Sequence, residues 1–167
     1  LARLATAHSP IRYRTFNTNM KNPGSYVYFG LQGDDFDPEE ITNLLGLDPT
    51  KILRKGEKGE YIAINKLSMW SLSTEIGKED IFIDNLVEEI VNKLYDKIDL
   101  INEIKTQYEL SSVLAIIIWI DKCDETSTPA LGHDLRTLEF LYRTGTITDV
   151  DMYKFDSISE PENKNVL

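Results

Sequence analysis

Two runs of the chain alternate between hydrophobic and other residues. In "SYVYFGLQG", Val27, Phe29 and Leu31 occupy every second position, and in "SMWSLST", Trp70 and Leu72 do the same. A period of two places alternate side chains on opposite faces of a strand. Each run therefore predicts a strand, and the first one is expected to bury one face.

A different period governs residues 83–104, where hydrophobic residues recur every three or four positions. This spacing is typical of an amphipathic helix and is the strongest helical signal in the chain. An unbroken helix over residues 80–108 would be about 40 Å long at 1.5 Å per residue, which is too long for a domain of this size. We therefore expect a bend or break near Asp96.

The run "VLAIIIWI" at residues 113–120 is apolar on both faces and rich in β-branched residues, which indicates a strand in the centre of a sheet. Glycines end two short helical patterns. The further elements are a basic edge strand within 50–57, helices at about 41–45 and 135–143, and a last strand over 146–155.

The order of these elements is β-α-β-β-α-β-α-β, which predicts an α+β fold. The first six match a split βαβ, ferredoxin-like sheet with helices on one face, which the last helix and strand extend. We expect a single domain over residues 21–156. Residues 1–20, which carry three arginines and no acid, are expected to be a flexible leader or artificial extension, and residues 157–167 a polar tail.

The net charge of the chain limits the classes of molecule that it is expected to bind. Lys and Arg number 18 and Asp and Glu 28, giving a net charge of −10, which repels phosphate backbones and anionic membranes. The single cysteine, Cys123, cannot form a disulfide within the chain. No apolar run reaches the ~20 residues of a membrane-spanning helix. We expect a soluble, cytoplasmic protein without a cofactor that binds neither nucleic acid nor membranes.

The acidic stretch "DDFDPEE" follows the first strand and raises the question of a metal site. Asp37 is a good helix N-cap, Pro38 suits the first helical position, and Glu40 is placed to reach back to the cap. An EF-hand calcium loop would need a glycine and a glutamate where this stretch has a glutamate and a glycine. A helix start is therefore favoured, and Asp34 and Asp35 are left as candidate metal ligands.

A second pair of acids lies on the last strand. Asp149 and Asp151 share one face and could share a metal ion or a proton. The simpler interpretation is a solvated face, with Val150 and Met152 pointing inward. A metal site would require this pair to meet the acids that follow the first strand.

Other candidate sites are weaker. Cys123 and His133 could form a nucleophile and base, but the surrounding acids disfavour a thiolate. The spacing G-x-x-G lacks the further residues of a nucleotide-binding loop, and no hydrolase or zinc-protease motif is present. A basic strip could bind an anion or an acidic partner, or simply protect an edge strand. It comprises Lys51, Arg54, Lys55 and Lys58.

The order and spacing of several segments resemble an uncharacterised bacterial family catalogued as domain of unknown function 4279. The matching pieces lie between Tyr26 and Tyr153: "YVYFGLQGDDFDPEEITNLLGLDPT", the following "RKGE", Trp70, "TPAL" and "DVDMY". The resemblance implies an α+β domain and brings no established activity or catalytic residue. Some members look like partners in interaction or toxin-immunity systems.

These observations favour a small cytosolic protein-binding module over an enzyme. Such a module could be an immunity-type partner and could form a homo-oligomer. Tyr26, Tyr28 and Trp70 are the aromatic candidates for partner contact. The alternative is a carboxylate-based, metal-dependent enzyme or metal binder. Its ligands would be Asp34, Asp35, Asp149 and Asp151.

Overall fold

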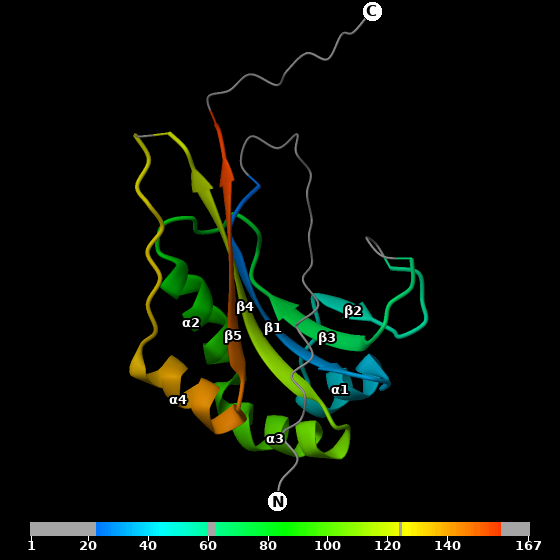
Figure 1. Ribbon diagram of the computed structural model, residues 1–167. Coiled ribbons are helices and arrows are strands. Elements are labelled where there is room, and N and C mark those ends of the chain that lie inside the picture. Colours follow the sequence, from blue (N-terminus) through cyan, green and yellow to red (C-terminus); the bar gives the residue numbers. More distant parts are fainter. Residues whose placement is uncertain (1–22, 60–62, 124, 158–167) are drawn as a thin grey trace, which may run out of the picture.

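The computed structural model describes residues 23–59, 63–123 and 125–157. Residues 1–20 and nearly all of the polar tail expected at 157–167 lie outside this range. The described strands form one sheet with the order β2-β3-β1-β4-β5 (Figure 1). The strands are β1 (Tyr26–Gly33), β2 (Lys51–Leu53), β3 (Ser68–Ser73), β4 (Ser111–Asp121) and β5 (Ile147–Phe155).

The pairing of the strands confirms the predicted topology. β1 pairs antiparallel with both β3 and β4, and β2 pairs antiparallel with β3. This is the strand order of a split βαβ, ferredoxin-like sheet. The additional strand β5 pairs parallel with β4 at the opposite edge from β2. The α+β fold and its extension by a helix and a strand are thus confirmed.

The described helices pack on one face of the sheet and share a core with it. The predicted break near Asp96 is confirmed, because a short 3-10 turn interrupts the long helical pattern there. In the described residues, no helix is long and apolar enough to cross a membrane. The helical elements are α1 (Pro38–Leu45), α2 (Ile83–Leu94), η1 (Tyr95–Lys97), α3 (Ile98–Gln107) and α4 (Leu135–Thr144).

Helix α1 begins and ends as its sequence predicts, with one difference. Asp37 is the N-cap, Pro38 starts the helix, and Gly46 ends it with a left-handed φ of 62°. The Asp37 carboxylate accepts from the N–H of Glu39 at 3.1 Å. The cap therefore acts on the second helical residue. In the described residues the Glu40 side chain does not bond to the cap N–H, so the expected reciprocal capping box does not form.

The helix-side core contains the largest fully buried side chains of the described residues, which are Trp70, Phe29 and Phe140. Phe29 and Phe140 meet edge to face, with ring centroids 5.9 Å apart. Trp70 is fully buried, and its indole N–H donates to Thr42 Oγ1 at 3.1 Å. This bond satisfies the one polar group of the buried indole and ties β3 to α1.

The other face of the sheet carries a second apolar cluster. It contains Tyr28 of β1 together with Met69, Val113, Ala115 and Ile117. The expectation that β1 buries one face is therefore wrong, because it lies in the middle of the sheet with apolar neighbours on both sides.

The inward and outward faces of β5 are also the reverse of the prediction. Val150 and Met152 are 38% and 67% exposed, although they were expected to point inward. Val150 is in register with Ile116, on the helix side, while Asp151 is in register with Ile117, on the other side. The predicted alternation is present, but at this edge strand the helix side is the more exposed one.

Candidate functional site

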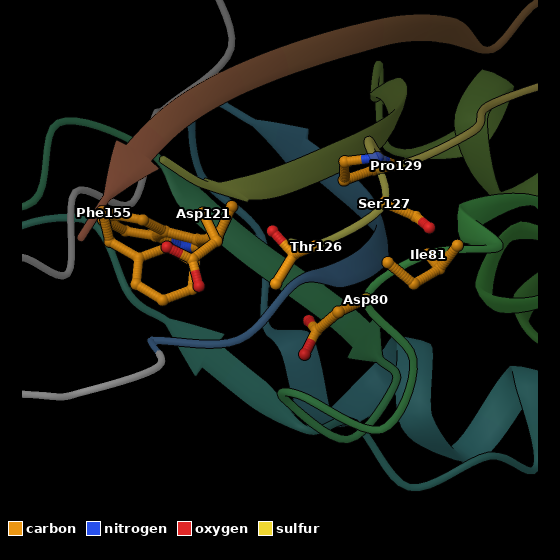
Figure 2. Close-up of a pocket in the computed structure, with 8 residues that line it drawn as sticks. Asp80, Ile81, Asp121, Thr126, Ser127, Pro129 and Phe155 are labelled. Atoms are coloured by element: carbon orange, nitrogen blue, oxygen red, sulfur yellow. The ribbon is translucent and has the colours of Figure 1, made fainter. Parts of the chain in front are cut away.

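A cavity of about 180 Å³ lies at the carboxyl ends of β4 and β5 (Figure 2). Ligand sites in open sheets with parallel strands often lie at this position, because the connecting loops leave a crevice there. The cavity combines aromatic, acidic and hydroxyl side chains. It is lined by Asp80, Ile81, Trp119, Asp121, Thr126, Ser127, Pro129 and Phe155.

The loop from β4 to α4 forms one wall of the cavity and is anchored to the start of α2. Ala130 N–H donates to the carbonyl of Ile81 at 2.7 Å, and Ile83 N–H donates to the carbonyl of Ala130 at 3.0 Å. These bonds form a bridge between Phe82 and Ala130. The loop is therefore held in place on the side next to α4.

The two acids of the cavity are oriented by backbone N–H groups. Asp80 Oδ1 accepts from the N–H of Ser25 at 2.8 Å. Asp121 Oδ1 accepts from the N–H groups of Cys123 and Ser157, at 3.1 and 3.2 Å. Hydrogen bonds from the Ser157 side chain and from these N–H groups lower the pKa of Asp121, so this carboxylate is charged at neutral pH.

Trp119 is the centre of an aromatic group beside these acids. Its ring centroid lies 4.9 Å from that of Tyr153 and 6.5 Å from that of Phe155. The backbone N–H of Trp119 donates to Ser25 Oγ at 3.0 Å, and Ser25 also contacts Asp80. Aromatic faces beside carboxylates form a suitable environment for an organic cation.

Exposed apolar side chains of α4 and β5, which together we call the α4–β5 patch, lie on the helix side of the sheet. Leu135, Leu138 and Tyr142 form one stripe of α4 and are 84%, 48% and 88% exposed. Val150 and Met152 of β5 point to the same side of the sheet. The opposite stripe of α4 is buried and contains Thr137, Phe140 and Thr144. The patch consists of Leu135, Leu138, Tyr142, Val150 and Met152.

The other end of the β4–β5 pair contains a closed polar network. Lys105 Nζ donates to Ser112 Oγ at 2.8 Å and to the carbonyl of Thr144 at the end of α4. Ser112 shares a hydrogen bond with Thr146, which shares another with Thr144. Burial lowers the pKa of Lys105. A lysine beside a serine can activate a nucleophile, but Ser112 is only 3% exposed, so we assign this network a structural role.

The acids predicted as metal ligands lie in two separate places. Asp34 pairs with Lys55 at 2.8 Å, just beyond the end of β1. Asp149 is in register with Ala115, and Ala115 with Tyr28. Six residues of strand, or roughly 20 Å, separate that level from Asp34. In residues 23–59, 63–123 and 125–157, no group of three or more acids, histidines or cysteines could hold a metal ion.

The acidic stretch meets part of the basic strip. Arg54 bridges Asp37 and Glu39 at 3.4 and 3.2 Å, and the hydrogen bond that it donates to the Glu39 carboxylate is the main cause of its raised pKa. With the bond between Lys55 and Asp34, these exposed pairs connect the end of β2 to the start of α1. Such pairs contribute little to stability, but they place positive charge beside the acids.

The aromatic contact candidates and the cysteine pair are placed as follows. Trp70 has no exposed surface, Tyr28 is 5% exposed, and Tyr26 is half-buried and stacked on Tyr28 with centroids 6.4 Å apart. The buried Nδ1 of His133 has no hydrogen-bond partner among the described residues, so it does not bind Cys123. The structure gives no support to a Cys–His dyad.

The comparisons with known proteins agree with the fold. The family model described as "Domain of unknown function (DUF4279)" matches residues 23–155. The chain belongs to the DUF4279 family. No curated protein and no solved structure matches the chain. The resemblance inferred from the sequence is thus confirmed, and membership in DUF4279 brings no known activity.

Two features of this DUF4279 domain, the cavity and the exposed stripe of α4, were not predicted from the sequence. The cavity draws on three parts of the chain that are far apart in sequence: the residues around Asp80, those around Trp119 and Thr126, and Phe155. No spacing rule joins them. The stripe of Leu135, Leu138 and Tyr142 did carry a signal, because hydrophobic residues at i, i+3 and i+7 mark one helix face. The sequence could not show that this face is the exposed one.

Proposed function

We propose that this protein is a protein-binding module whose α4–β5 patch contacts a partner protein. The observation that carries the proposal is the exposed stripe of α4. Leu135 and Tyr142 are almost entirely exposed, although the opposite side of the same helix is buried. Apolar side chains gathered along one exposed face mark a candidate interaction site.

The charge of the chain supports a basic partner. A net charge of −10 attracts a positively charged surface and repels a second copy of the chain. The arginines of α4 do not oppose this, because Arg136 stacks over the ring of Tyr95 at 4.0 Å and Arg143 pairs with Asp99 at 3.3 Å. We therefore propose an apolar contact surrounded by basic residues on the partner side.

The proposal also includes an immunity-type role and a cytoplasmic location. An immunity-type protein is one that binds and neutralises a partner, and a cytoplasmic location suits a chain with one cysteine. The metal-dependent alternative has no observation in its favour in the described residues, because its four candidate acids lie in two separate places.

The proposal is tested by site-specific photo-cross-linking in an extract of the native host. A photoreactive residue is placed at Tyr142, and in a matched variant at Leu44, which is an exposed apolar residue of α1. We expect one basic protein to cross-link at position 142 and not at 44. The purified partner should then bind wild-type protein more tightly than Leu138→Ser, which alters an exposed position of the patch.

Three results would contradict the proposal. They are equal cross-linking at both positions, an adduct only with a second copy of the chain, and a captured protein that binds Leu138→Ser as tightly as wild type.

A further inference from the structure

We propose that the cavity at the carboxyl ends of β4 and β5 binds the guanidinium group of an arginine side chain. The inference rests on the proposed function, since the arginine would belong to the partner protein. It names the chemical class of ligand for a cavity that lies outside the α4–β5 patch.

The size of the cavity favours a side chain over a free cofactor. Its volume of about 180 Å³ is smaller than the ~300 Å³ at which pockets for drug-sized ligands begin. The end of one long side chain fills such a space. A nucleotide or a flavin does not fit it.

The lining favours a planar cation. Trp119 and Phe155 provide aromatic surface, and guanidinium groups stack on such surfaces while donating hydrogen bonds from their edges. Asp80 and Asp121 reach the cavity from separate segments, before α2 and at the end of β4 (Figure 2). Thr126 and Ser127 add hydroxyl acceptors on the loop side. None of the described lining residues is a lysine or an arginine.

Both carboxylates are already held in place. Backbone N–H groups orient Asp80 and Asp121, so binding would not need to order them. Groups that are fixed before binding give up less entropy when the ligand arrives. The loop wall continues from Pro129 to Ala130, which is hydrogen-bonded to Ile81 and Ile83 at the start of α2.

Trp119 makes the proposal testable by fluorescence, because the second tryptophan, Trp70, is fully buried. The full chain is titrated with N-acetyl-arginine amide and, in parallel, with N-acetyl-citrulline amide, which has nearly the same shape but no charge. We expect a saturable change in emission with the arginine compound and none with the citrulline compound.

Two variants and one control extend the test. Asp121→Asn should weaken arginine binding about tenfold, the typical effect of losing a hydrogen bond to a charged group. Asp48→Asn removes the same charge from an exposed position outside the cavity and should leave binding unchanged. Phe155→Leu, which keeps both acids, should also weaken binding, so the test does not depend on Asp121→Asn being stable.

The inference is overturned if citrulline binds as well as arginine, or if both cavity variants bind arginine within about twofold of wild type. Tighter binding of free L-arginine than of the capped residue would overturn the assignment to a protein side chain. If a cross-linked partner binds Asp121→Asn and Phe155→Leu as tightly as wild type, the inference fails while the proposed function stands. If the arginine compound binds but no partner cross-links at position 142, the proposed function fails.

Discussion

The two ends of the β4–β5 pair differ in what their polar side chains do: those at one end bond to each other, and those at the other end border a cavity. At one end, Lys105 and the hydroxyls of Ser112, Thr144 and Thr146 bond to each other and to the carbonyls that end α4. At the other end, Trp119 and Asp121 line a cavity. Both ends contain charged and hydroxyl side chains, so composition does not distinguish them.

The connections explain the difference. At the first end, α4 runs directly into β5 through Gly145 and Thr146, and Lys105 of α3 closes over the carbonyls of this tight turn. At the second end, a longer connection separates β4, which ends at Asp121, from α4, which begins at Leu135, and its described residues Thr126, Ser127 and Pro129 line the cavity. A buried polar group that finds its partners inside the fold stabilises the fold, whereas a carboxylate that borders a cavity can accept further hydrogen bonds from a ligand.

The largest effect is expected in the strand that both ends share. Ile117 lies in the middle of β4 and is 7% exposed. Ile117→Ala should lower the free energy of unfolding by roughly 2–5 kcal/mol, because it empties a packed aliphatic site. Urea denaturation measures this value. Val150→Ala on the neighbouring strand, where the side chain is 38% exposed, should cost clearly less, and equal losses would contradict the described packing.

A pair of Thr→Val substitutions compares the two ends directly. Thr146→Val should lower the free energy of unfolding by about 1–3 kcal/mol, because it leaves the buried hydroxyls of Ser112 and Thr144 without a shared partner. Thr126→Val on the exposed loop should change it by at most about 0.5 kcal/mol. If Thr126→Val were the more destabilising variant, the assignment of a structural end and an open end would be reversed.

The sequence predicted the order of the elements better than it predicted their surroundings. The apolar run of β4, the break near Asp96 and the capping residue Asp37 were all identified, because each depends on neighbouring residues. The outward position of Val150 was not, since it depends on where α4 lies over the sheet. Phe140 of α4 reaches Phe29 of β1, which leaves the outer strand less covered.

The candidate site depends even more on long-range contacts. Asp80 and Asp121 were unremarkable in sequence, one before a helix and one at the end of a strand. They meet at the cavity because Ala130 pins the loop to the start of α2 and Ser25 joins Asp80 to Trp119. Contacts of this kind are set by the folded topology and leave no local spacing pattern.

The two ends should also respond to different ranges of pH. Burial lowers the pKa of Lys105, so between that lowered value and the unfolded value of about 10.4 the unfolded state binds more protons, and stability should rise with pH. Hydrogen bonds lower the pKa of Asp121, so its contribution is present above about pH 3.9 and is lost as the pH falls through the folded value.

Unfolding measured from pH 2 to 11 tests this smaller effect. Lys105→Met should remove the alkaline rise and keep the acid loss. Asp121→Asn should keep the alkaline rise and only reduce the acid loss, because other carboxylates, among them Glu79 and Glu89, also have lowered pKa values. An alkaline rise that persists in Lys105→Met would show that another group is responsible.

The most direct test of the account is an NMR titration of the ¹⁵N-labelled full chain with a short, capped peptide that contains one arginine. We expect shifts at the indole N–H of Trp119 and at the amides of Asp121, Thr126 and Phe155. The signals of Ser112, Thr146 and the buried indole of Trp70 should stay in place. Shifts concentrated at the Ser112 end, or an equal response to the same peptide with citrulline, would contradict the claim that the open end of β4 and β5 recognises arginine.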